Sequence, residues 1–169
     1  MSSNIINLLW ESFLETILMV GVSGGLGAAI GIPLGVFLFV TSPKGIMPKP
    51  YVNRIIGTIV NAVRSTPFII LLVAIIPFTR LIVGSSIGTV AAFVPLTIAA
   101  APLIARLVET SLREVDKGLI EAAQSMGATN TQIICKVLLP EAMPGILAGL
   151  TIAFVALVGS SAMAGAVGE

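Results

Sequence analysis

Charged residues divide the chain into long uncharged intervals. The intervals long enough to be membrane spans are residues 16–43, 55–79, 81–105 and 142–168, of which the second is interrupted by Arg64. A helix needs about 20 largely apolar residues to cross roughly 30 Å of hydrocarbon. The first interval is rich in glycine, which lets helix backbones approach closely in lipid. The pattern predicts four spans and therefore an all-α, polytopic membrane protein.

Composition supports lipid as the main solvent. The 169 residues are 56% hydrophobic and 10% charged, whereas soluble domains carry roughly 25% charged residues. A net charge of +1 without a basic arm argues against binding of nucleic acid. His is absent and Cys135 is the single cysteine, which excludes Cys/His zinc sites and histidine acid–base catalysis. We expect Cys135 to be a buried small hydrophobe.

Basic residues favour one orientation in the membrane. Seven Lys or Arg residues lie in the connections after the first and third predicted spans, against one after the second. The seven are Lys44, Lys49, Arg54, Arg106, Arg113, Lys117 and Lys136, and the one is Arg80. Cytoplasmic loops carry the excess of Lys and Arg. We therefore expect the N-terminus outside and the long connection 106–141 in the cytoplasm.

That long connection contains two helix signals separated by a turn. The first helix has apolar residues on one face, and Gly127 follows it where a helix C-cap is expected. These apolar residues are Leu119, Ile120, Ala123 and Met126. Thr129 and Gln132 then have the spacing of a capping box, which starts a second short helix. With Pro140 at the start of the fourth span, the pattern predicts a helix-turn-helix elbow over about 117–140.

The elbow resembles the EAA signature of ABC importer permeases. The matching residues are Glu121, Ala122, Ala123, Gly127, Val137, Leu138, Leu139 and Pro140. Two further stretches, 63–68 and 161–168, are similar to those of methionine-import permeases. The resemblance implies an ABC importer type I transmembrane-domain fold with a cytoplasmic coupling helix between spans three and four. It also implies a permease that moves methionine into the cytoplasm across the bacterial inner membrane.

The same resemblance implies partners and roles for the elbow. A homodimer of permease subunits in membrane lipid would work with two cytoplasmic ATP-binding cassette subunits and an external substrate-binding lipoprotein. The partner ATPase would use ATP, since the chain has no Gly-Lys-Ser/Thr phosphate loop, and the chain itself would bind no cofactor. Ala122 and Ala123 would seat closely in a groove of the ATPase, with Glu121 stabilising the helix N-terminus. An amphipathic interfacial helix is the alternative interpretation of the elbow.

Arg64 stands inside the second predicted span. An unpaired charge at the bilayer centre costs at least about 2.5–3.5 kcal/mol, so such residues are functional candidates. One interpretation pairs Arg64 with Glu109, which the predicted topology places near the same membrane face. The other lets the side chain snorkel to the cytoplasmic interface, and both interpretations stay open.

The fourth predicted span contains a run of small residues around one bulky side chain, Met163. Its neighbours include Ser160, Ser161 and Gly165. A flexible thioether at the two-fold axis of a dimer would act as a hydrophobic gate on a translocation pathway. Ordinary helix packing is the alternative, because Met commonly fills gaps.

Permeases of the resembled family usually have at least five spans. We therefore expect residues 1–169 to form a single transmembrane domain that lacks the usual C-terminal span. Two functions are open: a permease for methionine or another small amino acid, and a transport-incompetent fragment that keeps the elbow. An intramembrane enzyme would need ionisable groups placed together at membrane depth, and only Arg64 is available, so we discard this function. A channel is disfavoured, because it would have no use for an ATPase-docking elbow.

Overall fold

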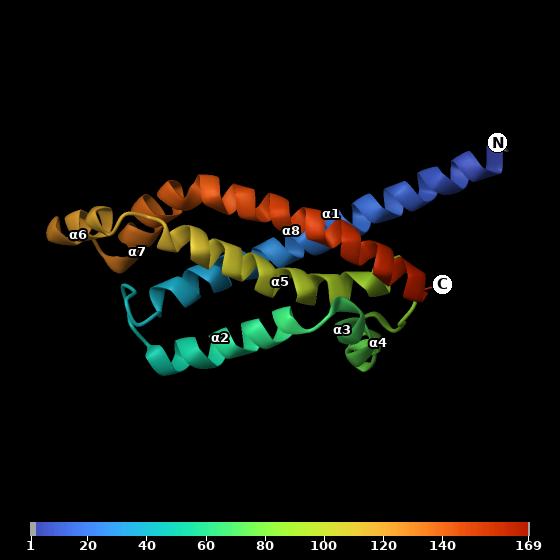
Figure 1. The fold of residues 1–169 in the computed structure, drawn as a ribbon, viewed down its shortest axis with the longest axis horizontal. Helices are drawn as coiled ribbons and strands as arrows, with labels where there is room; N and C mark the ends of the chain where they lie inside the picture. The colour runs from blue at the N-terminus through green and yellow to red at the C-terminus, as the bar shows by residue number, and fades with distance from the viewer. Residues whose placement is uncertain (1–2, 169) are drawn as a thin grey trace.

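The computed structural model describes residues 3–168, and all its regular elements within that range are helical. They are α1 (Ser3–Val40), α2 (Pro50–Ser65), α3 (Phe68–Ala74), α4 (Ile76–Val83), α5 (Thr89–Arg113), α6 (Lys117–Ser125), α7 (Asn130–Ile133), the π-helix η1 (Ile134–Leu138) and α8 (Leu139–Gly168). The long helices α1, α5 and α8 run along one another, with α6 and α7 at one end (Figure 1). The start of α1 and the end of α8 lie at the opposite end. The all-α prediction is confirmed.

Within residues 3–168, three segments are each long and apolar enough to cross a membrane: Asn4–Val40, Thr89–Arg113 and Asn130–Val167. The bent pair α2–α3 would make a fourth if both helices belong to one span. The predicted third span was misplaced, since α5 begins at Thr89 rather than Leu81 and continues past Arg106 to Arg113. It continues because the charged residues of its last turns form salt bridges with one another.

The predicted second span is broken. Helices α2 and α3 meet at an angle of 106°. Thr66 is extended (ψ 126°) before Pro67, as expected because the proline ring disfavours helical geometry in the preceding residue. The interval 55–79 therefore supplies a bent pair of helices and the start of α4, instead of one straight span.

Glycines hold α1 close to α5. A Cβ on Gly31 would lie 2.7 Å from the carbonyl oxygen of Ala101, and one on Gly35 would lie 2.5 Å from that of Ala105. No side chain fits at these distances, so the two backbones touch directly. The expected packing role of the glycine-rich first span is confirmed here.

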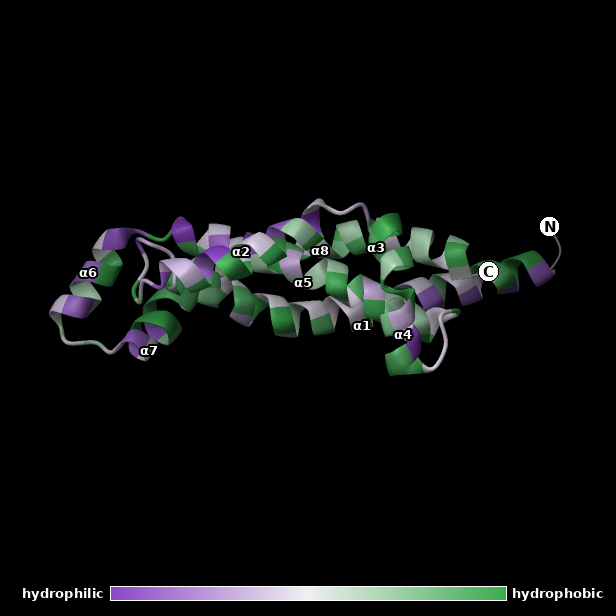
Figure 2. Ribbon diagram, turned by 90° about the horizontal axis from the view of Figure 1, so that it is seen from below, coloured by the Kyte–Doolittle hydropathy of each residue, from purple (hydrophilic) through white to green (hydrophobic). Residues whose placement is uncertain are grey.

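Helix α5 forms the centre of the bundle. Four of its large side chains, Leu96, Ile104, Val108 and Leu112, are at most 1% exposed, and α5 packs against both α1 and α8. Hydrophilic residues gather at the α6–α7 end and on α2 (Figure 2). The bundle therefore places the elbow at a polar end of an otherwise apolar body.

Candidate coupling elbow and charged cluster

Helix α6, the first arm of the elbow, is closed at both ends by local hydrogen bonds. At its start, the Gly118 N–H donates to the Asp116 side chain at 2.9 Å. At its end, the Gly127 N–H donates to the Gln124 carbonyl and the Ala128 N–H to the Ala123 carbonyl, both at 3.0 Å. This pair of bonds is a Schellman motif, with Gly127 at a φ of 77°. The predicted C-cap is confirmed.

The predicted capping box also forms. The Gln132 N–H donates to Thr129 Oγ1 at 3.3 Å, and the Thr129 N–H donates to Gln132 Oε1 at 2.9 Å. Two backbone donors that a helix start leaves free are thereby satisfied. The Schellman motif and the capping box meet at residues 127–129, so the turn between the arms is held from both sides.

The second arm differs from the predicted short helix, because α7, η1 and α8 follow one another without a break. The π-helix ends at Leu138, two residues before Pro140, which cannot donate to a carbonyl four residues earlier. A single turn of π-helix inserted in an α-helix is the usual form of this rare element. Movement at the turn therefore acts directly on the long helix α8.

The two faces of α6 are distinct. Ala123 is 5% exposed and belongs to the hydrophobic core, with Ile120 packed beside it. Leu119 and Met126 are 42% and 83% exposed. The four apolar positions predicted on one face are therefore divided between the bundle and solvent.

The predicted EAA residues are divided in the same way. Ala122 and Glu121 are exposed, whereas Ala123 faces the interior. Glu121 lies outside the first turn, and Asp116 caps the helix instead, so the predicted stabilisation of the N-terminus by Glu121 is corrected. Val137 and Leu139 are half-buried against the core, and Pro140 is exposed.

A charged cluster lies at the end of α5 nearest the elbow. Glu109 is 3% exposed. Its two carboxylate oxygens accept from Arg106 at 2.5 Å and from Arg113 at 2.6 Å. Arg106 also donates to the carbonyl of Gly57 in α2 at 2.9 Å.

This cluster corrects the predicted pair of Arg64 and Glu109. Arg64 is exposed in the last turn of α2, and within residues 3–168 the salt bridges of Glu109 go to Arg106 and Arg113. The spacing of the two arginines from Glu109, three and four residues on one helix face, was a readable signal for the true partners.

The small-residue run lies near the end of α8. Met163 is 45% exposed, whereas Ser161 is 4% exposed and donates to the Val158 carbonyl at 2.8 Å. Ser160 donates to the Ala156 carbonyl at 3.2 Å. A Cβ on Gly165 would meet no atom within 4 Å. Within one chain, α8 therefore presents Met163 on an uncovered face.

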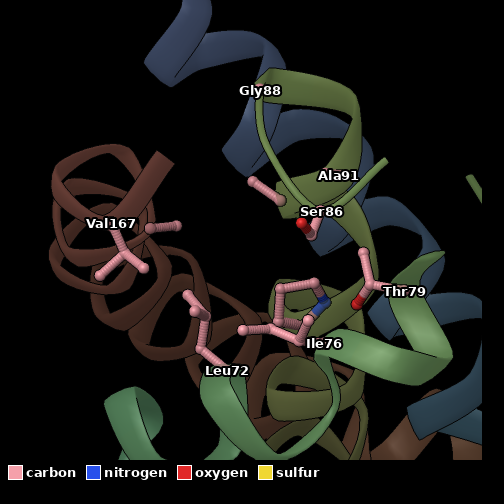
Figure 3. A pocket seen from close by; sticks show the side chains of 10 residues that line it. Leu72, Ile76, Thr79, Ser86, Gly88, Ala91 and Val167 are labelled. Atoms are coloured by element: carbon pink, nitrogen blue, oxygen red, sulfur yellow. The ribbon is translucent and has the colours of Figure 1, made fainter. Parts of the chain in front are cut away.

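The same end of the molecule holds a small cavity between α3, α4, α5 and α8. Leu72, Thr79 and Val167 are among the residues that line it (Figure 3). Its volume of about 30 Å³ suits one or two water molecules. An amino acid would not fit in it.

Cys135 was expected to be buried. It is exposed on η1, within the elbow.

A polytopic helical bundle that presents a rigid elbow at one end is typical of the membrane component of a transporter. Residues 31–169 match the family described as the inner membrane component of binding-protein-dependent transport systems. The chain belongs to this family. It is a multi-pass permease component of the inner membrane, not an enzyme.

Curated relatives refine the comparison. The chain is 57% identical over 162 residues to the probable D-methionine transport system permease protein MetI of Vibrio cholerae, covering 96% of this chain and 72% of that protein. It is 55% identical over 165 residues to MetI of Escherichia coli K12, covering 98% and 76%. It is 48% identical over 161 residues to the methionine import system permease protein MetP of Bacillus subtilis, covering 95% and 72%. The predicted resemblance to methionine-import permeases is confirmed.

Solved structures agree with the fold. An inward-facing structure of the MetNI methionine ABC transporter matches 100% of this chain and 78% of its own, with a TM-score of 0.97 and 55% identity. An amino acid ABC transporter crystallised with histidines matches with a TM-score of 0.67 and 23% identity. This second likeness concerns the fold alone. Together they confirm the predicted fold class.

Proposed function

We propose that this chain is the permease subunit of an ATP-driven ABC importer that moves methionine into the cytoplasm. The observation that carries the proposal is the likeness to the MetNI methionine ABC transporter, at 55% identity and a TM-score of 0.97 over the whole chain. The relatives named for methionine transport in three organisms support the same substrate.

The proposed assembly is a homodimer with two cytoplasmic ATP-binding cassette subunits and an external substrate-binding lipoprotein. The cassettes bind and hydrolyse ATP, and the permease binds no cofactor. Ala122, Leu119 and Met126 lie exposed on α6, an apolar face suited to a helix-in-groove contact. This face supports docking of the ATPase better than insertion in the membrane interface, because α6 stands at the far end of the bundle (Figure 1).

The proposed orientation places the elbow in the cytoplasm and the start of α1 outside. The connection between α1 and α2 carries Lys44 and Lys49 and lies at the same end as the elbow (Figure 1). Lys117 and Lys136 belong to the elbow itself. Basic residues concentrated at one end favour that end as the cytoplasmic one.

Met163 is proposed as a gate on the translocation pathway at the two-fold axis of the dimer. Its exposure on α8 supports the proposal, since a side chain shared between two subunits is uncovered in one. The small neighbours Ser160 and Gly165 are partly exposed and leave room for a partner helix, whereas Ser161 is buried within its own chain. Arg64 is proposed as a functional charge, exposed at the bend between α2 and α3.

Uptake of labelled methionine tests the function. Membrane vesicles containing this chain, its ATPase and its binding protein should accumulate methionine with ATP, and vesicles with a hydrolysis-deficient ATPase should not. Accumulation of a different small amino acid instead would overturn the substrate. ATPase docking without uptake of any amino acid would favour the transport-incompetent alternative.

A further inference from the structure

A series of three hydrogen bonds leads from the last turn of α5 to α2. Two of them lie within α5, and the third joins α5 to α2. Arg113 Nη2 donates to Glu109 Oε1, Arg106 Nη1 donates to Glu109 Oε2, and Arg106 Nη2 donates to the Gly57 carbonyl oxygen. We name these four residues, Gly57, Arg106, Glu109 and Arg113, the Glu109 latch. Because the Glu109 side chain is 4% exposed, its charge depends on the two arginines rather than on water.

Gly57 lets the Arg106 guanidinium lie close against α2. A Cβ there would lie 3.2 Å from Arg106 Nη2, so the guanidinium would have to shift by a few tenths of an ångström. The buried residues of α2 are Gly57 and Val60, so the helix touches the bundle along a narrow stripe. The bond from Arg106 is therefore a main polar tether between α2 and α5.

One end of the latch lies close to the elbow helix α6, and the other end lies in α2. Arg113 is the last residue of α5, and three residues separate it from α6. The other end of the latch is Gly57 in α2. The C-terminal end of α2 turns by 106° into α3, and Leu72 of α3 lines the cavity at the far end of the bundle (Figure 3). Helix α2 thus spans from the elbow end toward the opposite end, beside α5 (Figure 1).

We propose that the Glu109 latch transmits movement of α6 to α2 and so couples ATP hydrolysis to transport; this rests on the proposed function. The Arg113 side chain is 56% exposed, so a shift of α6 can withdraw it. Glu109 then keeps Arg106 as its one cationic partner. A buried carboxylate holds its remaining partner more strongly, which draws the guanidinium away from the Gly57 carbonyl and loosens the contact of α2 with α5.

A reconstituted complex of permease, ATPase and binding protein tests the latch. The measured quantity is ATP hydrolysed per methionine transported. Glu109→Gln, which keeps the shape but removes the charge, should raise this ratio by about fivefold or more, the lower range of allosteric coupling. Arg106→Lys should raise it too, because a lysine cannot hold both acceptors in the fixed geometry of a guanidinium. Glu114→Gln, at an exposed neighbour of Arg113, is the matched control and should leave the ratio unchanged.

Arg113→Gln tests the latch in a variant that is expected to fold, because the half-exposed Arg113 side chain is not part of the core. It should also raise the ratio of ATP hydrolysed to methionine transported. An unchanged ratio in folded Arg113→Gln would overturn the proposal, as would an unchanged ratio in folded Glu109→Gln.

A second measurement tests the latch independently of which amino acid the complex transports. Spin labels at Thr58→Cys on α2 and Gln124→Cys on α6, both exposed positions, are placed in a Cys135→Ser background. In the parent complex, ATP should displace both labels relative to the bundle. In Glu109→Gln, the α6 label should move while the α2 label stays. Joint movement in the variant would reject the latch even if the complex carries another amino acid.

Discussion

At the scale of single residues, Gly127 shows how a local conformation fixes a joint. Its φ of 77° lies in the left-handed region, which costs an L-residue with a side chain roughly 1–2 kcal/mol. A Cβ at this position would meet no atom within 4 Å. Backbone conformation, and not space, therefore demands glycine at the turn of the elbow.

Replacing Gly127 with valine should loosen the Schellman motif and let α6 move independently of α8. We expect ATP hydrolysis to continue while methionine uptake falls several-fold, measured in the same vesicles. Gly84→Val is the matched control, because Gly84 has a φ of 82° and equally empty surroundings but ends α4, away from the elbow. Equal loss of uptake in both variants would assign the effect to general strain.

Thr129→Ala should weaken the other side of the turn. Loss of an N-cap costs typically about 1 kcal/mol. Amide hydrogen exchange at residues 129–133 should therefore speed up by roughly fivefold. Thr131→Ala changes an exposed threonine of the same short helix and should leave exchange unaltered. Equal protection in both variants would mean that the capping box does not hold the turn.

These residues also show what sequence alone can establish about the site. The C-cap glycine and the capping box were predictable, because each depends on neighbours within a few residues. The Gly57 partner of Arg106 was not, because it lies 49 residues away in the chain. Of the two interpretations of Arg64, the pair with Glu109 is wrong, because the arginines nearer to Glu109 on its own helix already satisfy that carboxylate.

At the scale of helices, uncharged intervals located α8 well. They started the first span at residue 16, whereas α1 begins at Ser3 and runs through Glu11 and Glu15, and they misplaced the middle of the chain. The rule assumes that each charge ends a span. In α5 the charges are paired within the helix, so it continues through them. At Thr66 and Pro67 the rule failed in the opposite direction, because an uncharged dipeptide breaks the helix.

The contact between α1 and α5 gives a prediction at this scale. Gly31→Ala and Gly35→Ala should each lower the stability of the detergent-solubilised protein by about 1–3 kcal/mol, the usual cost of overpacking. Gly21→Ala and Gly25→Ala are controls on the same helix, since a Cβ there meets no atom within 4 Å. Thermal unfolding should show lower midpoints for the first pair alone. Equal midpoints for all four would mean that the close contact does not contribute to stability.

At the scale of the whole molecule, the polar elbow and the small cavity stand at opposite ends of one bundle (Figure 1). Between them run long helices, with α5 separated from α6 by three residues and α8 following directly from α7 and η1. Such rigid connections suit alternating access by rocking of helices about a fixed pathway. The mechanism depends on the elbow being cytoplasmic, where the ATPase is.

Thiol labelling can determine that orientation, because the native cysteine is a ready probe. Cys135 is exposed within the elbow, so a membrane-impermeant maleimide should label it only after spheroplasts are opened. Ser85→Cys in a Cys135→Ser background places a single exposed thiol between α4 and α5, and this thiol should react in intact spheroplasts. Opened spheroplasts, in which both thiols should react, provide the control for accessibility. Labelling of Cys135 in intact spheroplasts would put the elbow outside, where no ATPase could dock and the proposed coupling could not operate.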